Sequence, residues 1–367
     1  MAEPLKNQLD RTTVEVLAER FAKVHPEFNG PAFIAEAMSR FPELELKNRV
    51  NLVADLLADH LPDDYPTALS TVVAVAETDP GAWASWPLCS FVERHGLDHP
   101  TESLDAMHTL TRRWSCEFAI RPFLDHHLDE TRRHLRRWVD DPDEAVRRLA
   151  SEGTRPLLPW GPKVQAILDD PEIGLELLRA LRNDDSEAVR RSVANHLNDL
   201  AKSDAELVVA TITEWMIGER PIDERMVRRA LRTLVKRGHT GALRLLGFTV
   251  DPQIEIEAFE CRPASVELGE RIELTARLRS TADSDQLLVI DFVIHHVTAS
   301  GGTTPKVFKW ATPTVEPGQT LELSKKRLVQ TASTRRYHRG LHRVDLQVAG
   351  RVVASAEFHL RQSSPPR

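Results

Sequence analysis

Cysteine is scarce in this sequence, and long apolar segments are missing. The 367 residues include only Cys89, Cys116 and Cys261, which are far apart and show no CxxC or Cys/His ligand spacing. We therefore expect a reducing cytoplasm rather than a disulfide framework. Residues 1–10 lack the basic and apolar pattern of a signal peptide, and no run of about 18 apolar residues occurs. The sequence thus predicts neither secretion nor a membrane-spanning segment.

Signatures of nucleotide-binding and nucleophilic enzymes are missing as well. The chain contains no Walker motif, no GxGxxG loop and no GxSxG nucleophile elbow. Histidines are paired at positions 95/99, 126/127 and 338/342, but without the further ligands that a zinc site needs. The residues alone therefore predict no metal centre.

A strong charge of one sign is also lacking. The formal net charge of −7 argues against a uniformly basic surface, but it does not exclude nucleic-acid binding, because a local arginine cluster creates its own field. Hydrophobic residues make up 41% and charged residues 28%, as in an ordinary soluble globular protein. A chain of 367 residues is long enough for two domains.

Residues 1–110 have the apolar spacing of several short amphipathic helices, one of them over 46–61. This part supplies most of the negative charge, which favours an acidic, solvated helical shell. Trp83, Trp86 and Phe91 fit either core packing or the lining of a cleft, and packing is the favoured interpretation.

A repeat begins in the middle of the chain. The pentapeptide Glu-Ala-Val-Arg-Arg occurs at 144–148 and 187–191, with a weaker copy at 225–229. The central valines lie 43 (189 − 146) and 38 (227 − 189) residues apart, close to the period of HEAT-like helix pairs. The first two copies follow turns at 140–143 and 183–186 whose Asp and Ser residues suit helix starts. Stacked repeats would line a concave face with a column of arginines along one edge.

The pattern changes near residue 250 from helical spacing to alternation. Strands are predicted at 253–259, 271–278, 287–294, 306–310, 320–328, 340–348 and 352–360. Turn signals such as Ser300-Gly301-Gly302 separate these segments. We therefore predict a HEAT-like α-helical repeat domain over residues 1–249 and an immunoglobulin-like β-sandwich over residues 250–367.

One segment of the repeat region combines an acid, a base and an aromatic ring. Glu152 is predicted to end a helix before Gly153, and Arg155 with Pro156 begins a rigid turn that holds Trp160. Trp160 could stack on a sugar or base, or meet a cation with its face. The alternative is that Trp160 anchors the core and Glu152 pairs with Arg155.

Two further acids stand on either side of this segment. Glu117 is predicted to lie on a helix that starts near Leu110 and stops before Pro122, and buried carboxylates are rare unless they are paired. Asp199 lies near the end of the second repeat helix, beside His196. That histidine could act as a general base, although a lone helical histidine is more often structural.

Three motifs resemble the AlkC branch of the DNA alkylation-repair glycosylases, which are built of HEAT-like repeats. They are SCEFAIRPFL at 115–124, SEGTRPLLPWG at 151–161 and VRRSVANHLNDLAK at 189–202. The long form of that family also has a C-terminal immunoglobulin-like domain. The resemblance implies removal of 3-methyladenine, and also of 3-methylcytosine or 1-methyladenine, from bent duplex DNA without metal or cofactor. Nothing in the sequence indicates more than a monomer, and we expect it in the bacterial cytoplasm and nucleoid.

The resemblance carries the family's site onto Glu117, Glu152, Trp160 and Asp199. A methylated base is positively charged, so its bond to deoxyribose is already weakened, and catalysis needs negative charge beside the developing oxocarbenium ion and a positioned water. We assign Asp199 to the water and the oxocarbenium ion, Glu117 and Glu152 to the base and sugar, and Trp160 to the sugar or the lesion edge.

Basic residues supply the predicted contacts to DNA. The candidates are Arg147, Arg148, Arg155, Arg190, Arg191, Arg228 and Arg229 in the repeats, and Arg335, Arg336 and Tyr337 in a sandwich loop that fits either phosphate contact or a solvated turn. The rival hypotheses are a non-catalytic repeat scaffold that binds protein or DNA, and a structural DNA-bending protein.

Overall fold

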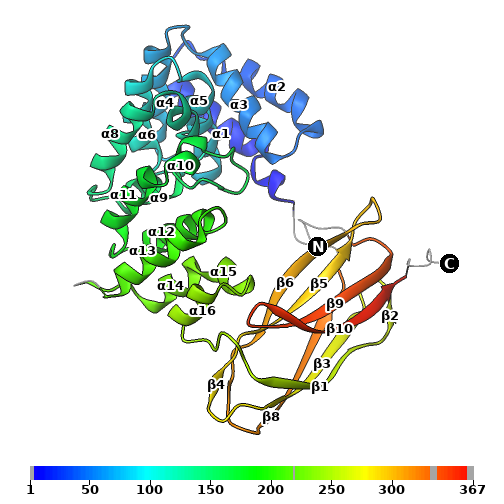
Figure 1. Cartoon of the computed structure of the whole chain (residues 1–367). Coiled ribbons are helices and arrows are strands. Elements are labelled where there is room, and N and C mark those ends of the chain that lie inside the picture. The colour runs from blue at the N-terminus through cyan, green and yellow to red at the C-terminus, as the bar shows by residue number, and fades with distance from the viewer. Residues whose placement is uncertain (1–3, 218–219, 331–336, 362–367) are drawn as a thin grey trace, which may run out of the picture. The chain divides into compact units, whose positions relative to one another are not determined.

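Helices account for the chain from Leu5 to Leu245, and strands account for it from Ile254 to Leu360. The computed structural model describes residues 4–217, 220–330 and 337–361 (Figure 1). Two compact units divide the chain, one of Met1–Ser203 and Glu219–Ala230 and the other of Asp204–Gly218 and Leu231–Arg367. No helix among the described residues is long and apolar enough to span a membrane.

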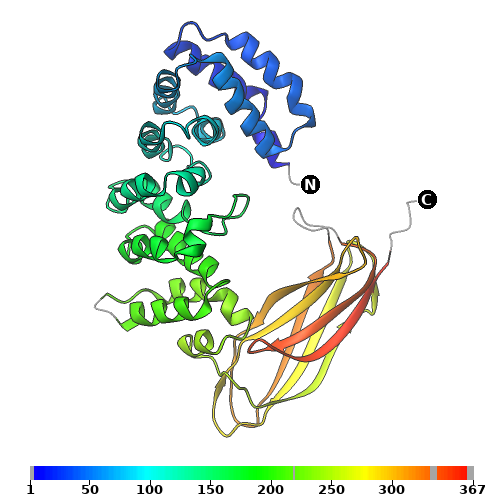
Figure 2. The same ribbon diagram turned by 45° about the horizontal axis from the view of Figure 1, so that its top comes forward.

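The first unit consists of helices that follow one another in chain order (Figure 2). They are η1 (Leu5–Gln8), α1 (Arg11–Val24), α2 (Gly30–Arg40), η2 (Phe41–Glu43), α3 (Leu46–His60), α4 (Tyr65–Glu77), α5 (Ala82–His95), α6 (Pro100–Leu110), α7 (Arg121–His126), α8 (Leu128–Trp138), α9 (Glu144–Glu152), α10 (Gln165–Asp169), α11 (Glu172–Leu181), α12 (Glu187–Leu200) and α14 (Glu224–Ala230). Helix α12 packs against both α9 and α14.

The repeated pentapeptide starts each of these three packed helices. Asp143 caps α9 by accepting a hydrogen bond from the amide of Ala145, and Ser186 caps α12 in the same way. The central valine is buried in all three copies. The predicted helix starts of the first two copies are therefore confirmed.

The first arginine of each full copy ties its repeat to the next one. The guanidinium of Arg147 donates two hydrogen bonds to the carboxylate of Asp184, at 2.6 and 2.9 Å. One repeat later, Arg190 lies 3.4 Å from the carboxylate of Asp223. Because these pairs join adjacent repeats, they fix the stacking of the helices that carry the candidate site.

The second unit contains a β-sandwich together with three helices. Its elements are α13 (Ala205–Ile217), α15 (Arg232–Lys236), α16 (Thr240–Leu245), β1 (Ile254–Arg262), β2 (Ser265–Val266), β3 (Arg271–Ser280), β4 (Gln286–Leu287), β5 (Ile290–Val297), β6 (Thr303–Ala311), β7 (Thr314–Val315), β8 (Thr320–Leu328), β9 (Gly340–Val348) and β10 (Arg351–Leu360). Strands β1-β3-β8 form one sheet, β2-β10-β9-β5-β6 a second and β4-β7 a short third. Inward side chains of the two larger sheets, such as Leu274 and Phe292, share one core.

A pair of glycines brings the helices of this unit against the strands. A Cβ atom on Gly350 would lie 2.1 Å from the Cα of Gly238, so only glycine fits this approach. Beside it, the side-chain amide of Gln347 donates to the carbonyl oxygen of Lys236 at 2.9 Å. Helix α15 is therefore anchored to the strand end by backbone contact.

The seven predicted strands are confirmed as β1, β3, β5, β6, β8, β9 and β10. The predicted helix from Leu110 to Pro122 is wrong. Helix α6 ends at Leu110, residues 111–120 form turns, and α7 begins at Arg121. Pro122 occupies the first turn of α7, where its missing amide hydrogen costs nothing, so it starts the next helix instead of ending the previous one.

Candidate active site

Arg121 organises the loop that carries the acidic and aromatic candidates. Its side chain is completely buried, and its guanidinium donates to the carbonyl oxygens of Gly153 at 3.1 Å, Arg155 at 2.8 Å and Pro162 at 2.8 Å. Burial lowers the pKa of Arg121 to about 10, so it stays charged at neutral pH. One buried cation therefore fixes the backbone of the loop from α9 to Pro162.

Arg155 joins two of the predicted catalytic acids. Its Nη1 donates to Oε1 of Glu152 at 2.6 Å, and its Nε donates to Oδ2 of Asp199 at 2.9 Å. Burial disfavours the charged form of Arg155, but the carboxylates of Glu152 and Asp199 outweigh it and hold its pKa above the ordinary value. The pairing of Glu152 with Arg155, which belonged to the alternative interpretation of this segment, is therefore present in the structure.

Arg148 extends this chain of charges to the third acid. Its Nη2 lies 3.8 Å from Oε1 of Glu152 and donates to Oε2 of Glu117 at 3.1 Å. These side chains thus form one continuous chain of alternating charges, in the order Glu117, Arg148, Glu152, Arg155 and Asp199. The structure therefore brings the three predicted carboxylates together.

The three acids differ in exposure and in their remaining partners. The Asp199 side chain is 1% exposed, that of Glu152 is 8% exposed and that of Glu117 is 18% exposed. Ser192 Oγ donates to Glu152 at 2.6 Å, and Lys202 Nζ donates to Asp199 Oδ1 at 2.8 Å. Taking a carboxylate out of water costs free energy unless hydrogen-bond donors of the protein replace the water. Each of these three carboxylates has such donors.

Trp160 lies at the surface and lines the same cavity as Glu117 and Arg148. The residue is 66% exposed, and its backbone has φ of 68°, in the left-handed region that a non-glycine residue rarely adopts. Lys47 Nζ donates to its carbonyl oxygen at 3.2 Å. The alternative that Trp160 anchors the core is therefore wrong, since the ring is offered to solvent.

A cavity of about 580 Å³ lies between Trp160 and Glu117. Four further aromatic residues line it: Trp83 and Trp86 from α5, and Trp114 and Phe118 from the residues between α6 and α7. The favoured packing interpretation is confirmed for Trp86 and Phe91, which are 5% and 1% exposed, whereas Trp83 is half-buried. Trp83 and one side of Trp86 also line this cavity. Trp114 was not predicted at all, because nothing local in the sequence shows that α5 and residues 111–120 face each other.

His196 is completely buried behind the acids. Its Nδ1 lies 3.1 Å from the carbonyl oxygen of Ser151, and burial lowers its pKa to about 4. A Cβ atom added to Gly174 would lie 2.8 Å from its Nε2, so the ring fills the space between α11 and α12. This placement favours the structural interpretation of His196 over the general base.

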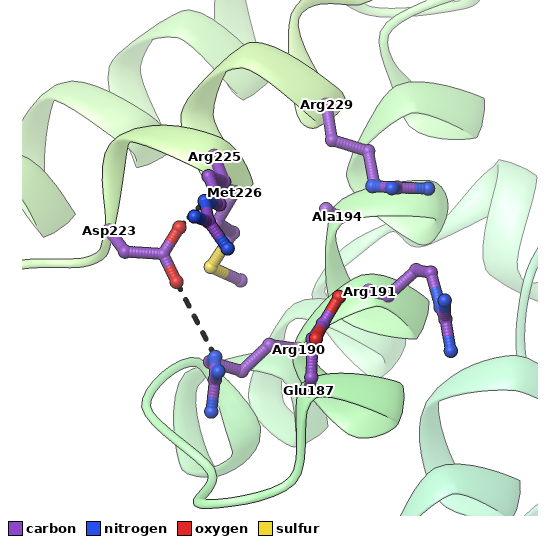
Figure 3. Close-up of a pocket in the computed structure, with 8 residues that line it drawn as sticks. All are labelled: Glu187, Arg190, Arg191, Ala194, Asp223, Arg225, Met226 and Arg229. Carbon is purple, nitrogen blue, oxygen red and sulfur yellow. Dashed lines mark hydrogen bonds and ion pairs between the residues drawn. The ribbon is translucent and has the colours of Figure 1, made fainter.

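A small arginine-lined pocket of about 120 Å³ lies between α12 and α14 (Figure 3). Arg190 turns toward Asp223, whereas Arg191 and Arg229 extend to the same side, away from that aspartate. The exposed Arg225 also lines the pocket and was absent from the predicted set. It occupies the glutamate position of the repeated pentapeptide, and that departure was the signal that could have identified it.

The other predicted DNA contacts are placed differently. Arg147 is used in the tie to Asp184, and Arg228 pairs with Glu224 one turn earlier. Tyr337 packs against the sandwich core with its ring centroid 4.7 Å from that of His296. Arg335 and Arg336 lie outside the described residues. Among the described residues, no cluster of three or more His, Cys, Asp or Glu side chains is arranged to hold a metal ion.

Comparisons with known proteins match both parts of this architecture. A sequence model of the family described as DNA alkylation repair enzyme matches residues 104–234, and one described as the C-terminal Ig-like domain of the uncharacterised protein YhaZ matches residues 255–362. Protein YhaZ of Bacillus subtilis (strain 168) is 32% identical over 358 residues, which cover 97% of this chain and 99% of YhaZ.

A solved structure extends the likeness to the whole fold. It is the alkylpurine DNA glycosylase AlkC of Pseudomonas fluorescens, bound to DNA that contains an abasic-site analogue. The likeness has a TM-score of 0.90 and 36% sequence identity, and it covers 98% of this chain and all of that one. Fold and site thus define the class, a HEAT-like helical-repeat DNA alkylation-repair protein with an immunoglobulin-like β-sandwich. The chain belongs to the AlkC family.

Proposed function

We propose that this protein is a DNA glycosylase that hydrolyses the N-glycosidic bond of cationic alkylated bases in duplex DNA, namely 3-methyladenine, 3-methylcytosine and 1-methyladenine. The observation that carries the proposal is the chain of alternating charges from Glu117 to Asp199 beside the exposed ring of Trp160. A binding scaffold has no use for three carboxylates held together at this cost in desolvation.

The chemistry follows from the charge of the substrate. An alkylated base that is already cationic leaves as a neutral molecule, so no general acid has to protonate it. The barrier lies in the positive charge that develops on the sugar, and fixed carboxylates in a largely buried site stabilise that charge strongly. Glu152 and Asp199, whose side chains are 8% and 1% exposed, supply this negative charge on the sugar side, while Glu117 faces the base.

Asp199 has the further task of holding the attacking water. Its Oδ2 is held by Arg155, which is buried, but its Oδ1 is held by Lys202, whose side chain is 36% exposed. When DNA binds, a backbone phosphate competes for the Lys202 ammonium. When the Lys202 ammonium leaves Asp199, Oδ1 is free to accept a hydrogen bond from water, while Arg155 still holds Oδ2 in place.

Basic side chains of the repeats hold the DNA backbone. Arg191, Arg225 and Arg229 line the pocket between α12 and α14, and the exposed Arg191 and Arg229 extend to one side of it (Figure 3). Contacts of this kind orient the duplex without reading its sequence and weaken as salt rises. We assign the same role to Arg335 and Arg336 of the sandwich loop, and we expect a monomer acting in the cytoplasm.

The proposal is tested by incubating the full chain with methylated duplex DNA and identifying the released bases by chromatography. We expect 3-methyladenine in the soluble fraction and abasic sites in the DNA, without added metal. DNA binding with no base released, at any enzyme concentration, would instead identify a scaffold or a DNA-bending protein.

A further inference from the structure

We propose that Lys47, on helix α3, is a positioning residue that holds the exposed ring of Trp160 in the direction in which it meets the substrate. The inference rests on the proposed function, in which Trp160 contacts the sugar or the edge of the lesion. It deepens that function by adding a residue of the N-terminal helices. Lys47 lies outside residues 104–234, which match the alkylation-repair family model, and outside the three sequence motifs.

Lys47 makes two contacts with the segments around the exposed ring. Its ammonium donates a hydrogen bond to the carbonyl oxygen of Trp160 at 3.2 Å, and it lies 4.8 Å from the centroid of the Phe118 ring. Lys47 and Trp160 are 113 positions apart, so this hydrogen bond joins α3 to the loop after α9 through tertiary packing alone. Because Lys47 is half-buried, the ring face and the carbonyl oxygen together give its ammonium a defined place.

The backbone of Trp160 needs a contact of this kind. Its φ of 68° lies in the left-handed region, which a bulky residue adopts only when its surroundings hold it there. Gly161 follows directly, and because glycine accepts a wide range of φ, the peptide between the two residues can rotate unless its carbonyl oxygen is held. The hydrogen bond from Lys47 holds that oxygen. It therefore also fixes the direction in which the side chain of Trp160 leaves the loop.

The flanking parts of the loop are held by a different cation. Arg121 donates to the carbonyl oxygens of Arg155 and Pro162, both at 2.8 Å. These two positions stand on either side of Trp160 in the sequence, and neither contact reaches the Trp160 carbonyl itself. Loss of the Lys47 ammonium should therefore release Trp160 while Arg121 keeps the rest of the loop in place.

The position of Lys47 is unfavourable for helix α3 itself. The N-terminus of a helix is the positive end of its dipole, where an acid stabilises the helix and a lysine does not. Lys47 is the second residue of α3, the first turn contains no acid, and the side chain of Glu45 makes no capping hydrogen bond. Local rules are broken in this way where a residue serves a site elsewhere in the fold. The contacts of Lys47 to the loop therefore explain its place better than α3 does.

A lysine close to bound DNA has another possible role, contact with a phosphate. Such a contact contributes to DNA affinity and to its salt dependence, whereas a positioning residue changes the rate through Trp160. Lys47→Met separates the two roles, because methionine keeps an apolar chain over the Phe118 ring but removes the ammonium. Lys23→Met, which changes an exposed lysine of α1, is the matched control.

The first measurement is the single-turnover rate of base release from methylated duplex DNA at saturating enzyme. Lys47→Met should release bases about tenfold more slowly than the wild type, since a misplaced substrate contact costs up to roughly 100-fold. Its DNA affinity and salt slope should stay as in the wild type, and Lys23→Met should change nothing. In a Trp160→Ala background, Lys47→Met should cause no further loss, because the residue that it positions is absent.

The second measurement observes Trp160 directly and does not depend on activity. The seven tryptophans are replaced by fluorotryptophan, and Trp160→Phe identifies the fluorine NMR resonance of Trp160. In Lys47→Met this resonance should narrow and move toward the frequency of free fluorotryptophan, because the ring has lost its fixed direction. The resonance of Trp310, in the sandwich, should stay where it is in the wild type.

Four results would overturn the inference: an unchanged Trp160 resonance, a shift of the Trp310 resonance as well, a rate loss that persists in the Trp160→Ala background, or a salt slope smaller by about 1. Base release by the wild type is measured in parallel. Absence of release by the wild type rejects the glycosylase proposal, whereas equally fast release by Lys47→Met rejects the role of Lys47 alone.

Discussion

Arg155 Nε lies 2.9 Å from Oδ2 of Asp199, and both side chains are almost completely buried. The same guanidinium holds Glu152 at 2.6 Å, so two predicted catalytic acids depend on one cation. Removing one partner of a buried pair leaves an uncompensated charge away from water. The residue that fixes the positions of the two acids is therefore also their shared counter-charge.

The first prediction concerns the stability that this arrangement needs. Arg155→Met should lower the free energy of unfolding by about 3–5 kcal/mol, because Glu152 and Asp199 lose their shared counter-charge while still buried. Arg228→Met is the control, since its partner Glu224 is exposed and such pairs contribute about 1 kcal/mol or less. Denaturant unfolding measures both variants, and equal losses would show that Arg155 does not hold the acids.

A second prediction separates Lys202 from Arg155. If Lys202 leaves Asp199 when DNA binds, Lys202→Met should keep the single-turnover rate of base release at saturating enzyme. It should lower the salt dependence of DNA binding, with a slope in log K against log salt smaller by about 1. A single-turnover rate that falls as far as that of an Asp199 variant would mean that Lys202 takes part in the chemistry.

The third prediction is a pH dependence caused by His196. Its pKa is about 4 in the folded protein and near 6.5 in the unfolded chain, so below pH 6.5 the unfolded state binds a proton that the native state does not. Stability should therefore fall as pH drops from about 6.5 to 4, by about 3 kcal/mol from this residue, and not change further below. In His196→Gln, the free energy of unfolding measured between pH 6.5 and 4 should lack this loss of about 3 kcal/mol.

A fourth prediction concerns the arginine pocket between α12 and α14. Arg191→Ala should weaken DNA binding to a similar degree for undamaged and damaged duplexes and reduce the salt slope by about 1, because a phosphate contact carries no base information. Arg179→Ala, on α11 and paired with Glu172, is the matched control and should leave the slope unchanged. A selective loss for damaged duplex would place Arg191 at the lesion instead.

Helices and strands whose signals lie within a few neighbouring residues could be predicted from the sequence. The helix starts of α9 and α12 follow from capping residues beside a buried valine, and the strands follow from alternation, as in β3. Pro122 misled the prediction because a proline fits both after one helix and in the first turn of the next. The local signal could not decide between the two.

The site was predicted only in part, for a physical reason. Glu152 and Arg155 are three residues apart, and their pairing is local, whereas Arg121 reaches the carbonyl oxygens of residues more than thirty positions later. A buried arginine that binds backbone oxygens leaves no pattern in the sequence. The aromatic lining of the cavity likewise requires that α5 meet residues 111–120, which only tertiary packing determines.

The most direct measurement of the central claim is the single-turnover rate of 3-methyladenine release from methylated duplex DNA by Asp199→Asn, compared with the wild type. The variant keeps the shape and one acceptor oxygen but loses the negative charge. The account predicts a rate at least about 100-fold lower, the usual loss when one electrostatic contact to a transition state is removed, with DNA affinity nearly unchanged. A wild-type rate in Asp199→Asn would contradict it.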